Sequence, residues 1–149
     1  MYPTIIIRHK KENLKKCSLR GLEKRENICF YSYPLKNELP DFSNYFLLEM
    51  NAPELKAQDQ DKGILLIDST WKYLAKILKI LPENIEKRSL PKNYISAYPR
   101  KQTMCTDPIR GLASIEALYL AYMLTKRDIT GILDNYYWKE QFLSINKLL

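Results

Sequence analysis

A carboxylate, two hydroxyl groups and an indole ring follow one another in the middle of the chain, at Asp68, Ser69, Thr70 and Trp71. They come directly after residues 63–67, a glycine and four aliphatic residues, which is typical of a central parallel strand covered on both faces. In open α/β sheets, ligands bind outside the carboxyl ends of the strands. A carboxylate there can orient a ligand or accept a proton, and an indole ring can form a flat apolar wall.

The same residues also have a purely structural interpretation. Asp68 or Ser69 could cap a helix, and Trp71 could belong to the core. A helix is expected here, because apolar residues recur at helical spacing from Trp71 to Leu81 and Pro82 ends the pattern. This segment alone favours the structural interpretation, so the choice depends on the rest of the chain.

The segments on either side predict strands before this point and a loop after it. Short runs of alternating or continuous apolar residues are typical of strands. The predicted strands cover residues 4–8, 27–33 and 45–50. Residues 96–110 lack periodicity and hold two prolines, which indicates a long loop, and such loops are often functional.

The last third of the chain is predicted to be helical. Apolar residues recur at helical spacing from Leu112, and Asp128 suits the cap of a further helix. The predicted helices cover residues 112–123, 128–136 and 138–148. With 149 residues the chain fits a single domain, which would have an α/β half at 1–95 and a mainly helical half at 96–149.

The composition argues against several classes of protein. No apolar run approaches the roughly 20 residues of a membrane span, and the N-terminus lacks the features of a signal peptide. The three cysteines are widely spaced, and with one histidine, His9, they support neither a disulfide framework nor a zinc site. No metal is expected, and a reducing cytoplasm fits best. A catalytic Cys–His pair stays open, although ordinary thiols are favoured.

Charge and glycine content restrict the ligands. The net charge of +7 favours polyanionic partners. Residues 13–25 are expected to form a short basic loop and helix. Basic residues concentrate at 8–25, where a solvated helix face and a phosphate-contacting patch are equally open interpretations. The four glycines form neither a G-x-G-x-x-G nor a Walker A pattern, so a nucleotide-like ligand must be held by another device.

Several segments, taken in order, resemble one family. Residues 15–22 resemble the K-[KR]-C-[ST]-x-x-[KR]-L segment of the small-subunit rRNA aminocarboxypropyltransferases, a ribosome-biogenesis family. Five later segments of this chain are similar to further motifs of that family, in the same order. They are Pro53-Glu54, similar to S-P-E-D, 67–71 to V-D-C-S-W, 88–91 to R-x-L-P, 112–118 to L-S-[ST]-V-E-A-L, and 136–146 to F-x-W-G…F-L-x-x-N. The chain also resembles the related D-x-T-W family, which modifies uridine in tRNA. Residues 68–71 fit its motif literally, and 96–102 are similar to its S-x-Y-x-x-R-K stretch.

The resemblance implies a fold, a donor and a reaction. The fold would be of the SPOUT type, a parallel sheet with a C-terminal helical part and a deep trefoil knot. S-adenosylmethionine, as co-substrate, would donate its 3-amino-3-carboxypropyl group to a ring nitrogen of a uridine or modified uridine in RNA, with rRNA favoured and tRNA as the alternative. Two other functions stay open: an RNA methyltransferase of the same fold, and a non-catalytic ribosome-assembly protein that binds RNA.

The resemblance also assigns residues to the site. Asp68 would hold the donor's amino group or fix the loop, and it is the first candidate for a catalytic base. Glu116 is a weaker candidate that could equally cap or brace its helix. Arg110 stands where the family often has an aromatic residue. The residues expected to bind the donor are Ser18, Ile67, Asp68, Trp71, Leu90, Arg110 and Ser114. The residues expected to contact RNA are Lys15, Lys16, Arg20, Arg100 and Lys101.

Overall fold

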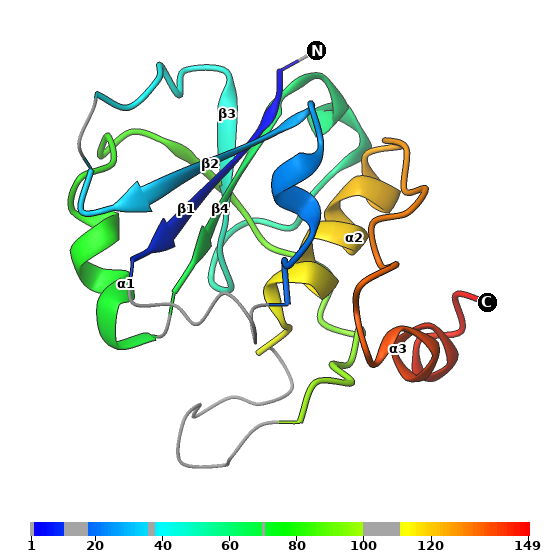
Figure 1. Ribbon diagram of the computed structural model, residues 1–149. Helices are drawn as coiled ribbons and strands as arrows, with labels where there is room; N and C mark the ends of the chain where they lie inside the picture. The colour runs from blue at the N-terminus through cyan, green and yellow to red at the C-terminus, as the bar shows by residue number, and fades with distance from the viewer. Residues whose placement is uncertain (1, 11–17, 36–37, 70, 100–110) are drawn as a thin grey trace.

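Five strands form one sheet in the computed structural model, which describes residues 2–10, 18–35, 38–69, 71–99 and 111–149. The strands are β1 (Thr4–His9), β2 (Ile28–Tyr33), β3 (Tyr45–Leu48), β4 (Gly63–Asp68) and β5 (Glu86–Arg88). They are ordered β2-β1-β4-β3-β5, and every neighbouring pair is parallel (Figure 1). This confirms the predicted α/β class with a parallel sheet, whereas the trefoil knot stays a prediction.

The central strand β4 is apolar throughout because both of its faces are covered. Side chains alternate between the faces, so Ile64 and Leu66 join one buried cluster while Leu65 joins another. The neighbouring strand β1 follows the same pattern, with Ile6 in the first cluster and Ile5 in the second. The interpretation of residues 63–67 as a central strand covered on both faces is confirmed.

Helices supply the cover on the two faces. Helix α1 (Trp71–Leu78) contributes Ile77 to one cluster. Helices α2 (Ser114–Leu124) and α3 (Lys139–Ile145) contribute Leu118 and Phe142 to the other. Figure 1 accordingly shows α1 at one side of the sheet and α2 and α3 at the other. No helix within the described ranges is long and apolar enough to cross a bilayer.

The helical half is less regular than predicted. The helix expected at 128–136 is wrong, because the chain forms successive turns there. The Asp128 carboxylate accepts a hydrogen bond from the N–H of Thr130 at 2.9 Å, and Gly131 has a φ of 76°, which an α-helix does not admit. A polar residue that looks like a helix cap therefore closes a turn. Of the basic loop and helix expected at 13–25, the described part holds only the 3₁₀ turn η1 (Leu22–Lys24).

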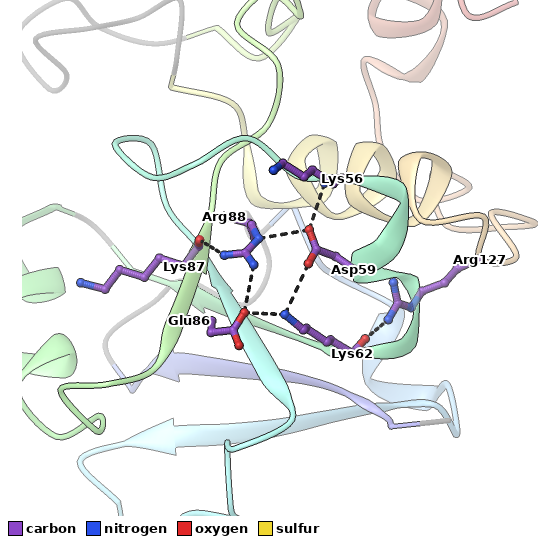
Figure 2. Close-up of polar contacts among 7 residues, drawn as sticks. All are labelled: Lys56, Asp59, Lys62, Glu86, Lys87, Arg88 and Arg127. Atoms are coloured by element: carbon purple, nitrogen blue, oxygen red, sulfur yellow. Dashed lines mark hydrogen bonds and ion pairs between the residues drawn. The ribbon is translucent and has the colours of Figure 1, made fainter.

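Edge strand β5 is fastened by charges (Figure 2). The Asp59 carboxylate, in the 3₁₀ helix η2 (Ala57–Asp61), is 1% exposed and accepts a hydrogen bond from Arg88 Nε at 3.1 Å. Glu86 contacts both Arg88 and Lys62, and Lys62 lies 3.5 Å from Asp59. The four side chains link β5 to the connection that leads into β4, so ion pairs hold the charged strand although Glu86 and Lys87 stay exposed.

Candidate functional site at the carboxyl ends of the strands

Asp68 lies at the carboxyl end of β4, as the sequence predicts, and its carboxylate is held from two sides. Ser114, the first residue of α2, donates its hydroxyl to Asp68 Oδ1 at 2.9 Å. Arg8 stands opposite Asp68 in the register of β1 and β4, and its Nε lies 3.4 Å from Asp68 Oδ2. Asp68 is 8% exposed. The strand end thus presents a buried carboxylate with a fixed orientation.

Arg8 brings a second acid to the same place. Its Nη1 donates to Glu23 Oε2 at 3.2 Å, and its guanidinium lies over the ring of Phe30 with Cζ 4.4 Å from the ring centroid. Partial burial alone would raise the pKa of Glu23, but hydrogen bonds from the N–H groups of Glu23 and Gly21 and from Arg8 outweigh it and lower that pKa. Glu23 therefore stays ionised beside the arginine.

The two serines assigned to the donor site meet at the amino end of α2. Ser18 accepts a hydrogen bond from the N–H of Ile115 at 3.2 Å, while the neighbouring Ser114 bonds Asp68. The first N–H groups of a helix lack partners within the helix, so Ser18 satisfies one of them. Asp68, Ser18 and Ser114, which are far apart in the sequence, are thus brought together.

Glu116 braces the structure. The residue is fully buried. Its Oε1 accepts hydrogen bonds from the Ser96 hydroxyl at 2.7 Å and the Ala113 N–H at 2.8 Å, and its Oε2 accepts from the Ala97 N–H and the Tyr136 hydroxyl, both at 2.8 Å. Four donors occupy the two oxygens, so the geometry favours the bracing interpretation over that of a base.

His9 lies on the opposite face of the sheet from Arg8. Its ring stacks on that of Tyr73, in α1, with centroids 3.8 Å apart and planes inclined by 18°. Cys29 pairs with Ile5 near the start of β1, whereas His9 pairs with Tyr33 at its end. Cys29 and His9 therefore form no catalytic pair, and the other two cysteines, Cys17 and Cys105, lie outside the described residues.

The remaining assigned residues divide into two groups. Among the described ones, Ile67 is the penultimate residue of β4, Leu90 follows β5 and packs against the cluster under α2, and Arg20 is exposed. Trp71 opens α1, but its side chain is outside the described part of the structure. Also outside it are Lys15, Lys16, Arg100, Lys101 and Arg110. Within the described ranges, no group of three or more His, Cys, Asp or Glu residues could hold a metal.

Sequence reasoning missed Arg8 and Glu23 as members of the site. Arg8 is the polar exception at the end of an aliphatic strand, just as Asp68 is in β4. That parallel was the available signal, since the carboxyl ends of neighbouring parallel strands meet at one edge. Using it required knowing that β1 and β4 are adjacent, which only the sheet order reveals.

Fold and site together define an α/β protein with an all-parallel five-stranded sheet and a polar cluster at its carboxyl edge. The fold is similar to that of the SAM-dependent rRNA:acp-transferase Tsr3 from Vulcanisaeta distributa, with a TM-score of 0.69 and 22% sequence identity. The match covers 99% of this chain and 80% of that one. At this identity it establishes a shared fold. No family model and no curated protein sequence matches the chain.

Proposed function

We propose that this protein transfers the 3-amino-3-carboxypropyl group of S-adenosylmethionine to a ring nitrogen of a uridine, or modified uridine, in rRNA. The observation that carries the proposal is the meeting of Asp68, Ser18 and Ser114 at the carboxyl edge of the sheet, on a fold similar to that of the SAM-dependent rRNA:acp-transferase. These three positions come from three separate segments of the sequence resemblance.

The chemistry of the edge suits such a donor. The sulfonium of the donor makes each of its three attached carbons electrophilic, so the orientation of the bound molecule selects the carbon that reacts. Asp68 offers an anionic partner for the donor's ammonium group. Ser18, with the backbone of Ile67 and Ser114, offers hydrogen bonds for the ribose hydroxyls, and Leu90 offers its backbone to the adenine edge. Trp71 and Arg110 complete the proposed donor-binding set.

The bonds in this reaction balance without a further reactant. The uridine nitrogen forms a bond to the terminal carbon of the aminocarboxypropyl chain, and the bond from that carbon to sulfur breaks. The electron pair of the broken bond stays on sulfur, which gives neutral methylthioadenosine, and the nitrogen loses its proton. Asp68 is the proposed acceptor or orienting group for this step. Glu116 is not proposed for it, because four donors already occupy its oxygens.

A positively charged surface would receive the RNA. We assign Lys15, Lys16, Arg20, Arg100 and Lys101 to it, in segments that flank Ser18 and precede Ser114 along the chain. The net charge of +7 supports a polyanionic partner, since Lys and Arg side chains that contact phosphates supply most of the sequence-independent affinity for RNA.

Transfer of a labelled group tests the proposal directly. The protein would be incubated with rRNA and S-adenosylmethionine labelled in the carboxypropyl carbons, and we expect label in RNA together with release of methylthioadenosine. Release of S-adenosylhomocysteine with a methylated nucleoside would make the protein a methyltransferase. Label in tRNA alone would favour the uridine modification that the literal D-x-T-W match suggests. Absence of donor binding by calorimetry would indicate a non-catalytic RNA-binding protein.

A further inference from the structure

Arg8 is buried, yet it uses few of its hydrogen-bond donors. Its side chain is 9% exposed. An arginine has five N–H donors, and the described contacts give one hydrogen bond, from Nη1 to Glu23. Nε faces Asp68 at 3.4 Å as an ion pair without a hydrogen bond. Nη2 is also buried and has no hydrogen-bond partner in the part of the chain that the structure describes.

Unused donors of this kind point to a missing acceptor. Proteins pair the large majority of their buried polar groups, because a donor removed from water without a partner is costly. Arg8 is also held in place, since Glu23 bonds one end of the guanidinium and the ring of Phe30 lies against its face. A fixed, planar guanidinium with free N–H groups matches the geometry of a carboxylate or phosphate.

The charges around Arg8 select between those two anions. Arg8 lies between two acids, Glu23 and Asp68, so the described ion pairs of this cluster hold two carboxylates for one guanidinium. An RNA phosphate would add a further negative charge. S-adenosylmethionine instead carries a sulfonium, an ammonium and one carboxylate, and its single net positive charge complements the cluster. Its carboxylate then needs a cation, and its ammonium needs an acid.

We propose that Arg8 binds the carboxylate of the donor's aminocarboxypropyl group, with Asp68 beside it for the ammonium. This assignment rests on the proposed function and adds a residue to it. Holding both charged groups of the chain would fix the terminal carbon of that chain relative to the sheet edge. Arg8 would thereby help to present that carbon, rather than the methyl group, to the RNA.

Binding of two ligands that differ only in the carboxylate separates this role from a structural one. Calorimetry would compare S-adenosylmethionine with its decarboxylated form, which keeps the sulfonium and amine but lacks the carboxylate. We expect the wild-type protein to bind S-adenosylmethionine at least about tenfold more tightly. In Arg8→Gln that preference should disappear, with the affinity for S-adenosylmethionine lowered about ten- to a hundredfold, the range of a charge-assisted hydrogen bond. Arg8→Lys should retain part of the preference, because it keeps the charge without the planar fork.

Arg25→Gln is the matched control, because Arg25 bonds the Thr130 carbonyl and takes no part in the cluster. Thermal unfolding of each variant would show whether it folds, and the wild-type comparison of the two donors needs no variant at all. Equal wild-type affinities for the two donors would overturn the assignment. An equal loss of affinity for both ligands in Arg8→Gln would also overturn it, as would a loss of RNA affinity alone. If the wild-type protein binds neither donor, the proposed function itself fails, which is a distinguishable result.

Discussion

At the scale of single residues, the site is a buried carboxylate whose described contacts include the hydroxyl of Ser114 and the guanidinium of Arg8. Asp68 is bonded by Ser114 and paired with Arg8, so its orientation is fixed before any ligand arrives. A catalytic or binding group gains from such fixing, because orientation contributes to rate and need not be achieved during the reaction.

Substitutions of Asp68 separate its charge from its hydrogen bonding. Asp68→Ala should lower the transfer of carboxypropyl label to RNA about a hundredfold or more, since it removes the proposed acceptor and orienting group. Asp68→Asn keeps the shape, so near-normal transfer would mean that Asp68 only orients, and a loss like that of alanine would mean that its charge matters. Single-turnover assays measure both. Asp61→Ala, at an exposed acid, is the control, and normal transfer by Asp68→Ala would contradict the assignment.

The sequence predicted part of this arrangement. The strand end and the helix after it follow from the apolar runs, and the family resemblance brought Ser18 and Ser114 to Asp68. The position of the Arg8 guanidinium could not be predicted from the sequence, because it depends on β1 lying next to β4. Glu116 could be a base or a brace from sequence alone, and only its four hydrogen bonds decide between them.

At the scale of elements, sequence periodicity succeeded where apolar side chains decide the structure. Strands β1, β2, β3 and β4 were predicted from such runs. Strand β5 consists of Glu86, Lys87 and Arg88, so no apolar pattern marks it, and charged residues of this kind are typical of an edge strand. The helix predicted from Asp128 failed because an aspartate that closes a turn has the same local sequence signal as a helix cap.

Glu116, in α2, joins the connection at 96–97, the cap of its own helix and the turns around Tyr136, so its substitution should destabilise the fold. Glu116→Gln replaces one acceptor oxygen by an amide that donates, so one backbone N–H would lose its acceptor and one hydroxyl would have to turn and accept instead. We expect a decrease of about 1–3 kcal/mol in the free energy of unfolding, the range for buried polar groups left unsatisfied. Urea unfolding measures it. Glu140→Gln, at an exposed position of α3, should change little, and an equally small change at Glu116 would show that it is dispensable.

The Asp59 network should make stability depend on acid pH. Burial alone would raise the pKa of Asp59, but the Lys56 N–H, Arg88 and Lys62 outweigh it and lower that pKa in the folded protein (Figure 2). In the unfolded chain the pKa is near its ordinary value of about 4. The ionised group therefore stabilises the fold above that value, and the stabilisation is lost as the pH falls through the lowered folded pKa.

Asp59→Asn tests this dependence. We expect it to lower the free energy of unfolding at pH 7 by about 1–3 kcal/mol, because Arg88 and Lys62 lose a charged acceptor. The difference between variant and wild type should shrink as the pH is lowered towards 3. Urea titrations at several pH values measure it, with the exposed Glu83→Gln as control. A difference that stays constant with pH would show that the charge of Asp59 is unimportant.

At the scale of the whole molecule, the excess positive charge is the feature to test. Replacing Lys15 and Lys16 together by glutamate should weaken RNA binding and reduce the slope of log affinity against log salt by about one unit for each phosphate that the protein no longer neutralises. Affinity for the donor should barely change. Filter binding over a series of salt concentrations gives the slope. The pair Lys79→Glu and Lys92→Glu alters the net charge equally at exposed positions, and an identical effect there would indicate that RNA responds only to overall charge.

The bonds of Glu116 have a consequence for how the chain can vary. One carboxylate accepts from Ser96 and Ala97 on one side and from Ala113 on the other, so residues 96 and 113 are tied to a common point. The closure entropy of a flexible loop grows only with the logarithm of its length, by about 0.6 kcal/mol for each doubling. Insertions or deletions between these two anchor points would therefore not displace the start of α2. Ser114, which bonds Asp68, would keep its position. A chain tied in this way can acquire a different connection at this point while the end of β4 and the start of α2 keep their contact.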